Sequence, residues 1–438
     1  MSDAWWFVDP IHAWNIATAM AVAAGCALVG TLLVVRRMSL VGDAISHAVL
    51  PGIVVAVLVG ARPGGPWVMV GAVIAAVATA WLAAGLSGEA GVAEDAGIGV
   101  AFTTMFALGV ALVSALASRI DLDPACVLHG ELELAAFDSL PVAGVEVPRG
   151  FLVAVAVFVV IAAGLAATWP AQVFAAFDAA AARAAGVPVG ALSMALLAAT
   201  AVTTVAGFGV AGAVLVVALL VVPAATAELL VDRLHHVARL AIVIGMFAAA
   251  AGYVAAWRLD TSAAGMIAVV LGGCYLAAAL AAPADGVIAR GVMAWALRWR
   301  VAREDWLASL WREGEGSVGG RPRGAFGRLV LESLIASGAV ERSASGPRLS
   351  STGRSRAETI VRSHRLWEAW LGRNVELPLD HLHPPAEWVE HHIGREVRER
   401  LAEELGARTD DPHGRAIPPE SPEPRSDGPN AGDAGSRR

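Results

Sequence analysis

The stretch RRMSLVGDAISHAVLPGIVVA, residues 36–56, decides how the first half of the chain is interpreted. Its apolar residues predict a membrane-spanning helix, yet that helix carries Asp43 and His47, four residues apart, just before Pro51 and Gly52. A carboxylate in hydrocarbon costs about 2.5–3.5 kcal/mol on insertion scales, so an intramembrane Asp is a candidate for function. Residues at i and i+4 share a helix face, and carboxylate and imidazole donors together suit Mn, Fe or Zn. A hydrogen-bonded pair that only holds neighbouring helices together is the plain alternative.

The composition is that of a membrane protein with several spans. Hydrophobic residues make up 57% of the 438 residues and charged residues only 16%. Every basic residue is Arg, and the absence of Lys excludes a P-loop, which needs a Lys to reach the phosphates. The three cysteines have no paired spacing, and the start MSDAWWFVDP lacks the basic segment of a cleavable signal peptide.

The apolar runs predict about eight or nine transmembrane helices within residues 1–285. The runs lie at about 14–35, 40–60, 66–86, 96–118, 150–168, 190–206, 209–227, 238–256 and 263–281. With nine spans, four groups of arginines fall on one side, which we therefore expect to be cytoplasmic, with the N-terminus outside. These arginines are Arg36, Arg37, Arg183, Arg233, Arg239, Arg290, Arg298 and Arg300. The acidic segment 121–149 then faces outside, as a solvated loop or as a docking surface for an external partner.

Beyond Pro283 the composition becomes that of a soluble domain. Residues 304–312, 326–340, 356–371 and 384–405 have the periodicity of amphipathic helices, and residues 343–354 read as a short hairpin. We divide this part into a segment of helices and a hairpin (298–356), a helical domain (357–418) and a disordered Pro/Gly/Ser-rich tail (419–438).

Two sets of His and Glu residues follow helical spacing in the helical domain. His364 and Glu368 are four residues apart, and a second stripe is formed by His383, Glu387, Glu390 and His391. A solvated charged face is the plain interpretation of such stripes. Interleaved tryptophans and clustered histidines favour a mononuclear or binuclear metal site with mixed nitrogen and oxygen ligands.

The membrane part resembles the metal-type ABC permeases, the membrane subunits of manganese, zinc and iron importers. Residues 36–56, EDAGIGVAFTTMFALGV (94–110), FDAAAARAAGVPV (177–189) and GAVLVVALLVVPAATAELL (212–230) carry the resemblance. It implies a dimer with a second copy or a paralogue, a separate ATPase and an extracytoplasmic metal-binding protein. Asp43 and His47 then line the cation path. The resemblance also places a cytoplasmic segment on the ATPase, with Phe177, Asp178, Ala182 and Gly186 as its motif residues.

The C-terminal part is similar to metal-dependent repressors of the diphtheria-toxin-repressor and manganese-repressor type. RSHRLWEAWL (362–371), HPPAEWVEHHIGREVRERL (383–401) and DPHGRAIP (411–418) carry this resemblance. It implies one metal site of His364, Glu368 and His383, and a second of Glu387, Glu390 and His391, with Asp305 as a further ligand. Glu387 stands where manganese-type members have Glu and iron-type members have Cys, which favours Mn(II). Ala308, however, stands where a manganese-type member has a carboxylate.

Together these patterns predict an all-α polytopic membrane protein followed by a mostly α cytoplasmic domain, in a bacterial inner membrane. We expect a non-catalytic permease subunit for Mn, Zn or Fe, with the same metal as regulatory ligand. The two alternatives are a secondary metal transporter and a membrane-tethered or released transcriptional regulator. Residues 298–356 resemble a degenerate winged helix of these repressors, but residues 313–328 match poorly, so DNA stays an alternative partner beside membrane lipid.

Overall fold

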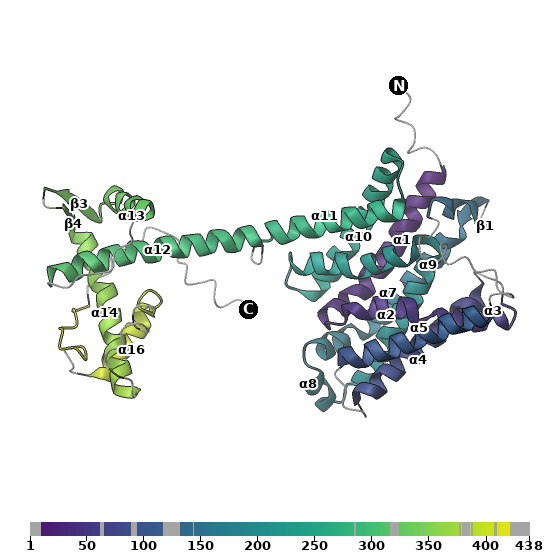
Figure 1. Cartoon of the computed structure of the whole chain (residues 1–438), viewed down its shortest axis with the longest axis horizontal. Coiled ribbons are helices and arrows are strands. Elements are labelled where there is room, and N and C mark those ends of the chain that lie inside the picture. The colour runs from purple at the N-terminus through teal and green to yellow at the C-terminus, as the bar shows by residue number, and fades with distance from the viewer. Residues whose placement is uncertain are drawn as a thin grey trace, which may run out of the picture. The chain divides into compact units, whose positions relative to one another are not determined.

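The computed structural model describes residues 10–61, 65–88, 94–116, 132–142, 144–283, 286–315, 324–344, 346–375, 378, 386, 389–406 and 410–420. The chain divides into two compact units, Met1–Ala289 and Arg290–Arg438, which are treated one at a time. The prediction of a helical membrane region followed by a mostly helical domain is confirmed (Figure 1).

Unit 1 is a bundle of apolar helices. They are α1 (Pro10–Val35), α2 (Ser39–Ala48), α3 (Leu50–Leu58), α4 (Pro66–Gly88), α5 (Glu94–Leu116), α7 (Arg149–Phe177), α8 (Ala179–Ala184), α9 (Val189–Glu228), α10 (Leu234–Leu259) and α11 (Ala263–Ala281). Among the described residues, α1, α5, α7, α9, α10 and α11 are long and apolar enough to cross a membrane, and α4 contains a shorter apolar stretch. The chain is therefore a multi-pass membrane protein.

The expected runs and the observed helices differ at two places. The run at 40–60 is broken into α2 and α3, because Val49 separates the two helices and Pro51 stands in the first turn of the second. The runs at 190–206 and 209–227 lie in one helical element, α9, with a kink at Gly212, whose φ is +76°. Only a residue without a Cβ adopts that backbone conformation readily.

Small residues allow the helices of unit 1 to pack closely around α1, which contacts α7, α9 and α10. A Cβ added at Gly30 of α1 would lie 1.7 Å from the Leu220 carbonyl oxygen of α9. A Cβ added at Gly52 of α3 would lie 2.1 Å from the Gly71 carbonyl oxygen of α4. The Gly- and Ala-rich sequence thus brings backbones together where lipid provides no hydrophobic driving force between helices.

The segment between α5 and α7 is partly folded against the helix ends. It contains a short 3-10 helix (Leu132–Phe137) and an antiparallel hairpin of β1 (Ser139–Val142) and β2 (Val145–Pro148). Asn15, buried in α1, donates to the Glu133 carbonyl and to the Tyr253 hydroxyl, both at 3.0 Å. This network fixes the described end of the acidic segment; residues 121–131 lie outside the described residues.

Unit 2 contains most of α12 (Val287–Gly314), then α13 (Gly324–Ala336), the hairpin of β3 (Val340–Ser343) and β4 (Gly346–Leu349), α14 (Ser351–Asn374) and α16 (Arg395–Leu405). Trp306 and Leu307 of α12, Val330 and Leu334 of α13 and Ala357 of α14 form one apolar core. The predicted continuous helix 384–405 is wrong. Residues 390–394 are not helical, and α16 begins after Gly394, whose backbone is extended.

Candidate functional site

The first candidate site lies on α2, at the Asp–His pair. Its helix packs against α9 and α5, and a Cβ at Gly42 would lie 3.0 Å from Leu220 Cδ1 of α9. The half-buried His47 ring is 5.8 Å from the Phe102 ring and 5.5 Å from the Phe106 ring of α5, between ring centroids. The backbone of Asp43 lies in α2, but its side chain lies outside the described part of the structure, so the ligand pair stays a prediction.

The second candidate site is the short helix between α7 and α9, where the motif residues have distinct physical roles. Asp178 caps α8: its Oδ1 accepts from the Ala180 amide at 3.0 Å and the Ala181 amide at 2.8 Å. Ala182 is fully buried, and Gly186 takes a φ of +82° that closes the turn after α8. Phe177 remains exposed, with 72% of its surface accessible. The motif thus forms a capped helix with an apolar side chain presented outward.

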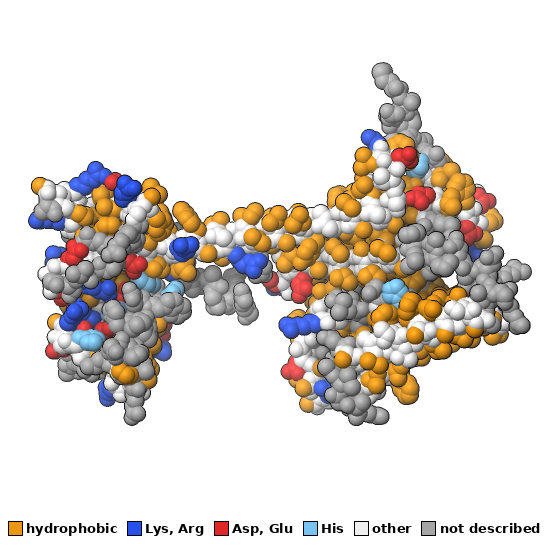
Figure 2. Space-filling view, viewed as in Figure 1, with side chains coloured by type: hydrophobic (Ala, Val, Ile, Leu, Met, Phe, Trp, Pro, Cys, Tyr) orange, Lys and Arg blue, Asp and Glu red, His pale blue; other side chains and the backbone are white. Residues whose placement is uncertain are grey.

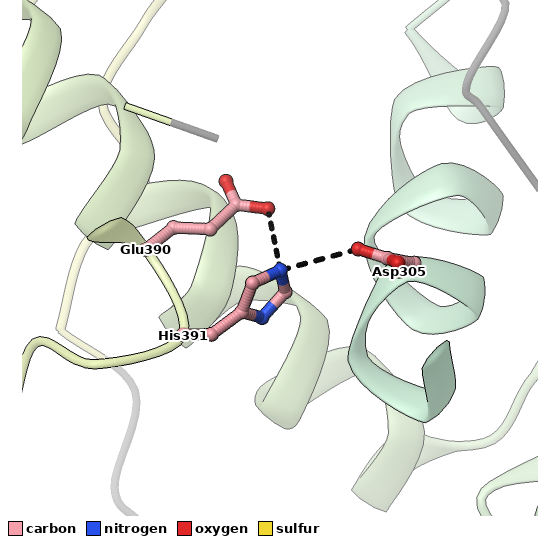
Figure 3. Close-up of side chains that lie close together, drawn as sticks. All are labelled: Asp305, Glu390 and His391. Carbon is pink, nitrogen blue, oxygen red and sulfur yellow. Dashed lines mark ion pairs between the residues drawn. The ribbon is translucent and has the colours of Figure 1, made fainter. Parts of the chain in front are cut away.

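The third candidate site surrounds His391 in unit 2 (Figure 3). His391 Nε2 lies 3.2 Å from Asp305 Oδ1 of α12 and 3.6 Å from Glu390 Oε1. These three residues form the one group among the described residues whose His, Cys, Asp or Glu donor atoms all lie within 4.8 Å of one another. The opposite ring nitrogen, Nδ1, lies 2.6 Å from Glu304 Oε2. Three carboxylates therefore surround one imidazole.

Glu390 connects this group to the other predicted metal residues. Its Oε2 lies 2.6 Å from His364 Nδ1, and His364 Nε2 lies 3.1 Å from Glu368 Oε1. The side chain of Glu390 is 1% exposed. The sequence assigned His364 and Glu368 to one site and Glu390 and His391 to another, whereas in the structure one buried carboxylate contacts both histidines. His383 and Glu387, predicted for the same two sites, lie outside the described residues.

Three residues of the cluster were not identified from the sequence. Arg312 of α12 forms an ion pair with Glu390, Nη2 to Oε2 at 3.1 Å, and His413 Nε2 lies 4.0 Å from Glu368 Oε1. The third is Glu304, which directly precedes the predicted ligand Asp305. A second carboxylate next to a predicted ligand could have identified it from the sequence. Arg312 and His413 become neighbours of the cluster only through folding, and no spacing rule points to them. Ala308, where a carboxylate was expected, is fully buried against Ile360 and Val361.

The carboxylates control the charge of both histidines. Burial by itself lowers the pKa of His391, but contacts with Asp305 and Glu304 and the charge of Glu390 raise it to about 10. Burial likewise opposes protonation of His364, and Glu368 and Glu390 raise its pKa above the ordinary value. His391 is therefore protonated at neutral pH in this structure, protonation of His364 is favoured, and together with Arg312 these groups balance the buried carboxylates.

The donor set fits a divalent transition metal. Carboxylate oxygens and imidazole nitrogens, with no thiolate among the described members, suit Mn, Fe or Zn. Neighbouring ligands about 2.1 Å from an ion lie roughly 3 Å apart, close to the observed separations from His391 Nε2. Asp305, Glu390 and His391 Nε2 would hold the ion, and Glu304 on Nδ1 is placed as the outer carboxylate that orients a ligating histidine.

In the segment expected to resemble a winged helix, the described helix α13 exposes apolar side chains beside charged ones. Between α12 and the β3–β4 hairpin, the described residues contain one helix, α13. Its exposed residues include Leu329 and Phe326, with Arg328 and Glu332 as its charged side chains. A recognition helix instead presents Arg, Lys, Asn or Gln to base edges.

Family comparisons agree with this division of the chain. Residues 9–282 match the profile of the ABC 3 transport family, and residues 350–419 match the profile described as iron dependent repressor, metal binding and dimerisation domain.

Several characterised relatives match the membrane part. The manganese transport system membrane protein MntD of Bacillus subtilis is 40% identical over 280 residues, which cover 64% of this chain and 95% of MntD. The zinc transport system membrane protein TroD of Treponema pallidum is 35% identical over 280 residues, covering 64% of this chain and 76% of TroD. A probable iron transport system membrane protein of Haemophilus influenzae is 28% identical over 270 residues, covering 62% and 89%.

A solved structure shares the membrane fold. PsaBC from Streptococcus pneumoniae in complex with Fab matches with a TM-score of 0.54 and 24% identity, covering 64% of this chain and 95% of that chain. The profile match covers well over half of the sequence and coincides with the apolar helices of unit 1. The chain is therefore a non-catalytic membrane protein of the ABC 3 transport family, and its residues 350–419 match the metal-binding and dimerisation domain of iron-dependent repressors.

Proposed function

We propose that this protein is the membrane permease of an ABC importer for a divalent transition metal, with a metal-sensing domain fused to its C-terminus. The observation that carries the proposal is the family match over residues 9–282, whose relatives are named for manganese, zinc and iron transport. Mn(II) is favoured as cargo and as regulatory ligand, and Fe(II) and Zn(II) are the alternatives.

Asp43 and His47 ligate the cation during its passage. Pro51 in the first turn of α3 supports this role, because it lacks an N–H, and an interrupted hydrogen-bond ladder inside the membrane is tolerated where it lines a cavity. One copy offers two groups, and a second copy or a paralogue related by two-fold symmetry supplies two more. Few ligands suit a transport path, in which binding has to permit release.

The segment 177–186 transmits force from a separate ATPase. The capped helix α8 and the exposed Phe177 side chain support this assignment. They form a short helix between two long helices, with an apolar side chain exposed next to it. An extracytoplasmic metal-binding protein delivers the cargo on the opposite side.

Unit 2 lies in the cytoplasm and binds the same metal when the cell is replete. The cluster of Asp305, His364, Glu368, Glu390 and His391 supports this role, with His383 and Glu387 as the further predicted ligands. Glu390 contacts both histidines, so we place it as the shared ligand of the site. Of the residue types that contact base edges, α13 contains only Arg328, which favours allosteric inhibition of transport over DNA binding.

Uptake measurements test the transport role. Asp43→Ala and His47→Ala, reconstituted with the cognate ATPase and binding protein, should each lose ATP-dependent Mn(II) uptake at unchanged expression. His235→Ala is a matched control, because this exposed histidine lies in the first turn of α10, on a different helix from Asp43 and His47. Full uptake in both variants would reject the path assignment. Uptake that needs a proton gradient and no ATPase would instead indicate a secondary transporter.

Metal titration tests the sensing role separately. Full-length His391→Ala should lose Mn(II) bound in excess of the transport site and keep uptake when external metal is scarce. Unchanged metal stoichiometry would reject the sensing site but leave the permease assignment intact. Sequence-specific, Mn(II)-dependent DNA binding by the full-length protein would favour the transcriptional alternative.

A further inference from the structure

The first half of α12, residues 287–300, exposes apolar side chains over almost its whole length. Ile288, Val292 and Trp295 have exposed fractions of 59%, 61% and 59%. Figure 2 shows hydrophobic side chains along this helix with arginines beside them. Among the apolar clusters of the described residues, the core of unit 2 takes up only Trp299 from this part, at its edge. A soluble protein rarely leaves so much contiguous apolar surface without a partner.

The apolar residues are arranged as one stripe. Ile288, Val292, Trp295 and Trp299 follow the spacing i, i+4, i+7, i+11 and so share one helix face. The Trp295 and Trp299 rings are stacked, with centroids 5.4 Å apart. At about 100° per residue, Arg298 and Arg300 lie roughly 100° to either side of the stripe, and Arg290 lies on the opposite side. This face is thus an apolar stripe flanked by two cations, while Met293 and Leu297 expose apolar side chains away from it.

Two features identify the partner of this stripe. The first is its composition, because Trp prefers the boundary between hydrocarbon and headgroups, and Arg side chains reach outward to anionic headgroups. The second is its position in the chain, because α12 begins at Val287, shortly after the apolar helix α11 ends at Ala281. A segment so close to a membrane span remains near the bilayer surface.

We infer that residues 287–300 form an interfacial helix that binds the anionic cytoplasmic leaflet through the Ile288–Trp299 stripe and its flanking arginines. The same helix carries Glu304 and Asp305, one turn beyond Arg300. The lipid-binding stripe and two residues of the metal cluster therefore share one continuous helix. The inference is independent of which metal the protein carries.

Spin-label accessibility on the full-length protein tests this placement. The three native cysteines are replaced by Ala, and a nitroxide is attached to Val292→Cys on the stripe or to Leu297→Cys on the opposite side. Leu297 is a matched control because it is also apolar and exposed. The protein is reconstituted in phosphatidylcholine alone or with about 30% phosphatidylglycerol, a typical anionic surface. The readout is the accessibility of each label to oxygen and to a water-soluble nickel chelate.

The label at position 292 should become oxygen-accessible and chelate-protected in the anionic bilayer, while the label at 297 stays accessible to the chelate. Replacing the two flanking arginines, Arg298 and Arg300, by Gln should reduce partitioning about 25-fold, at roughly fivefold per arginine near an anionic surface. The charge-matched control replaces two exposed arginines on other helices of unit 2, Arg328 and Arg354. It should leave the protection unchanged.

Three outcomes would overturn the inference. Equal chelate access at 292 and 297 in the anionic bilayer would show that the stripe does not bind lipid. Protection that requires addition of the ATPase would assign the stripe to that protein. Protection in detergent together with spin–spin broadening would assign it to a second copy of the chain.

Discussion

Glu390→Gln is the sharpest test of the buried cluster in unit 2, because it removes one charge and keeps the side-chain volume. The Glu390 carboxylate is 1% exposed and faces Arg312, His364 and His391 at 3.1, 2.6 and 3.6 Å. A glutamine leaves Arg312 and the His391 cation without this counter-charge, and it removes a carboxylate that favours protonation of His364. Removing one partner of a buried ion pair costs about 3–5 kcal/mol. We expect about 3 kcal/mol, the lower end, because Arg312 is 16% exposed and can recover some solvation.

Amide hydrogen exchange of the α14 peptides, measured on the full chain with a chelator present, reports this loss as local unfolding. A cost of about 3 kcal/mol corresponds to roughly 150-fold faster exchange. Glu399→Gln is the matched control, since it breaks the exposed Arg395–Glu399 pair of α16, and exposed pairs contribute about 0–1 kcal/mol. If Glu390→Gln exchanged within twofold of the control, Glu390 would not be the electrostatic centre of the cluster.

Three further predictions follow from the geometry. With a chelator present, protonation of His391, whose pKa is elevated, stabilises unit 2. This stabilisation is complete below about pH 6.5 and is lost as the pH rises towards 10. Amide hydrogen exchange corrected for intrinsic rates should show the loss, and stability that rises with pH would contradict it. Gly30→Ala should cost about 1–3 kcal/mol, because its Cβ meets Leu220 backbone, and should lower the melting temperature in detergent. Gly164→Ala is the control and should leave the melting temperature unchanged, because a Cβ there meets open space. Equal melting temperatures of the two variants would count against the close contact at Gly30. Asp178→Ala should destabilise α8 by about 1 kcal/mol, measured by amide hydrogen exchange, because it removes the N-cap. Asp178→Asn should recover most of this stability, and equal exchange rates in the Asn and Ala variants would disprove the cap.

The sequence predicted the local chemistry of the candidate sites better than their connections. The motif residues at 177–186 predict a short segment between two membrane helices. In the structure Asp178 caps α8, Ala182 packs inside, and Gly186 closes the turn that follows. The helix 384–405 was predicted as continuous because its His/Glu spacing is helical. The chain breaks there at residues 390–394, so periodicity alone did not locate the end of the helix.

By itself the sequence determined that the chain spans a membrane, that a distinct domain follows, and which residue types could ligate a metal. These properties follow from composition and spacing along one chain, which hydropathy and helical periodicity report directly. Only the tertiary structure decided that Glu390 joins two predicted sites, that Glu304 and Arg312 belong to them, and that Ala308 belongs to an apolar core. Those facts depend on how α12, α14 and the turn at 390–391 pack together, and such contacts between distant segments leave no periodic trace in the sequence.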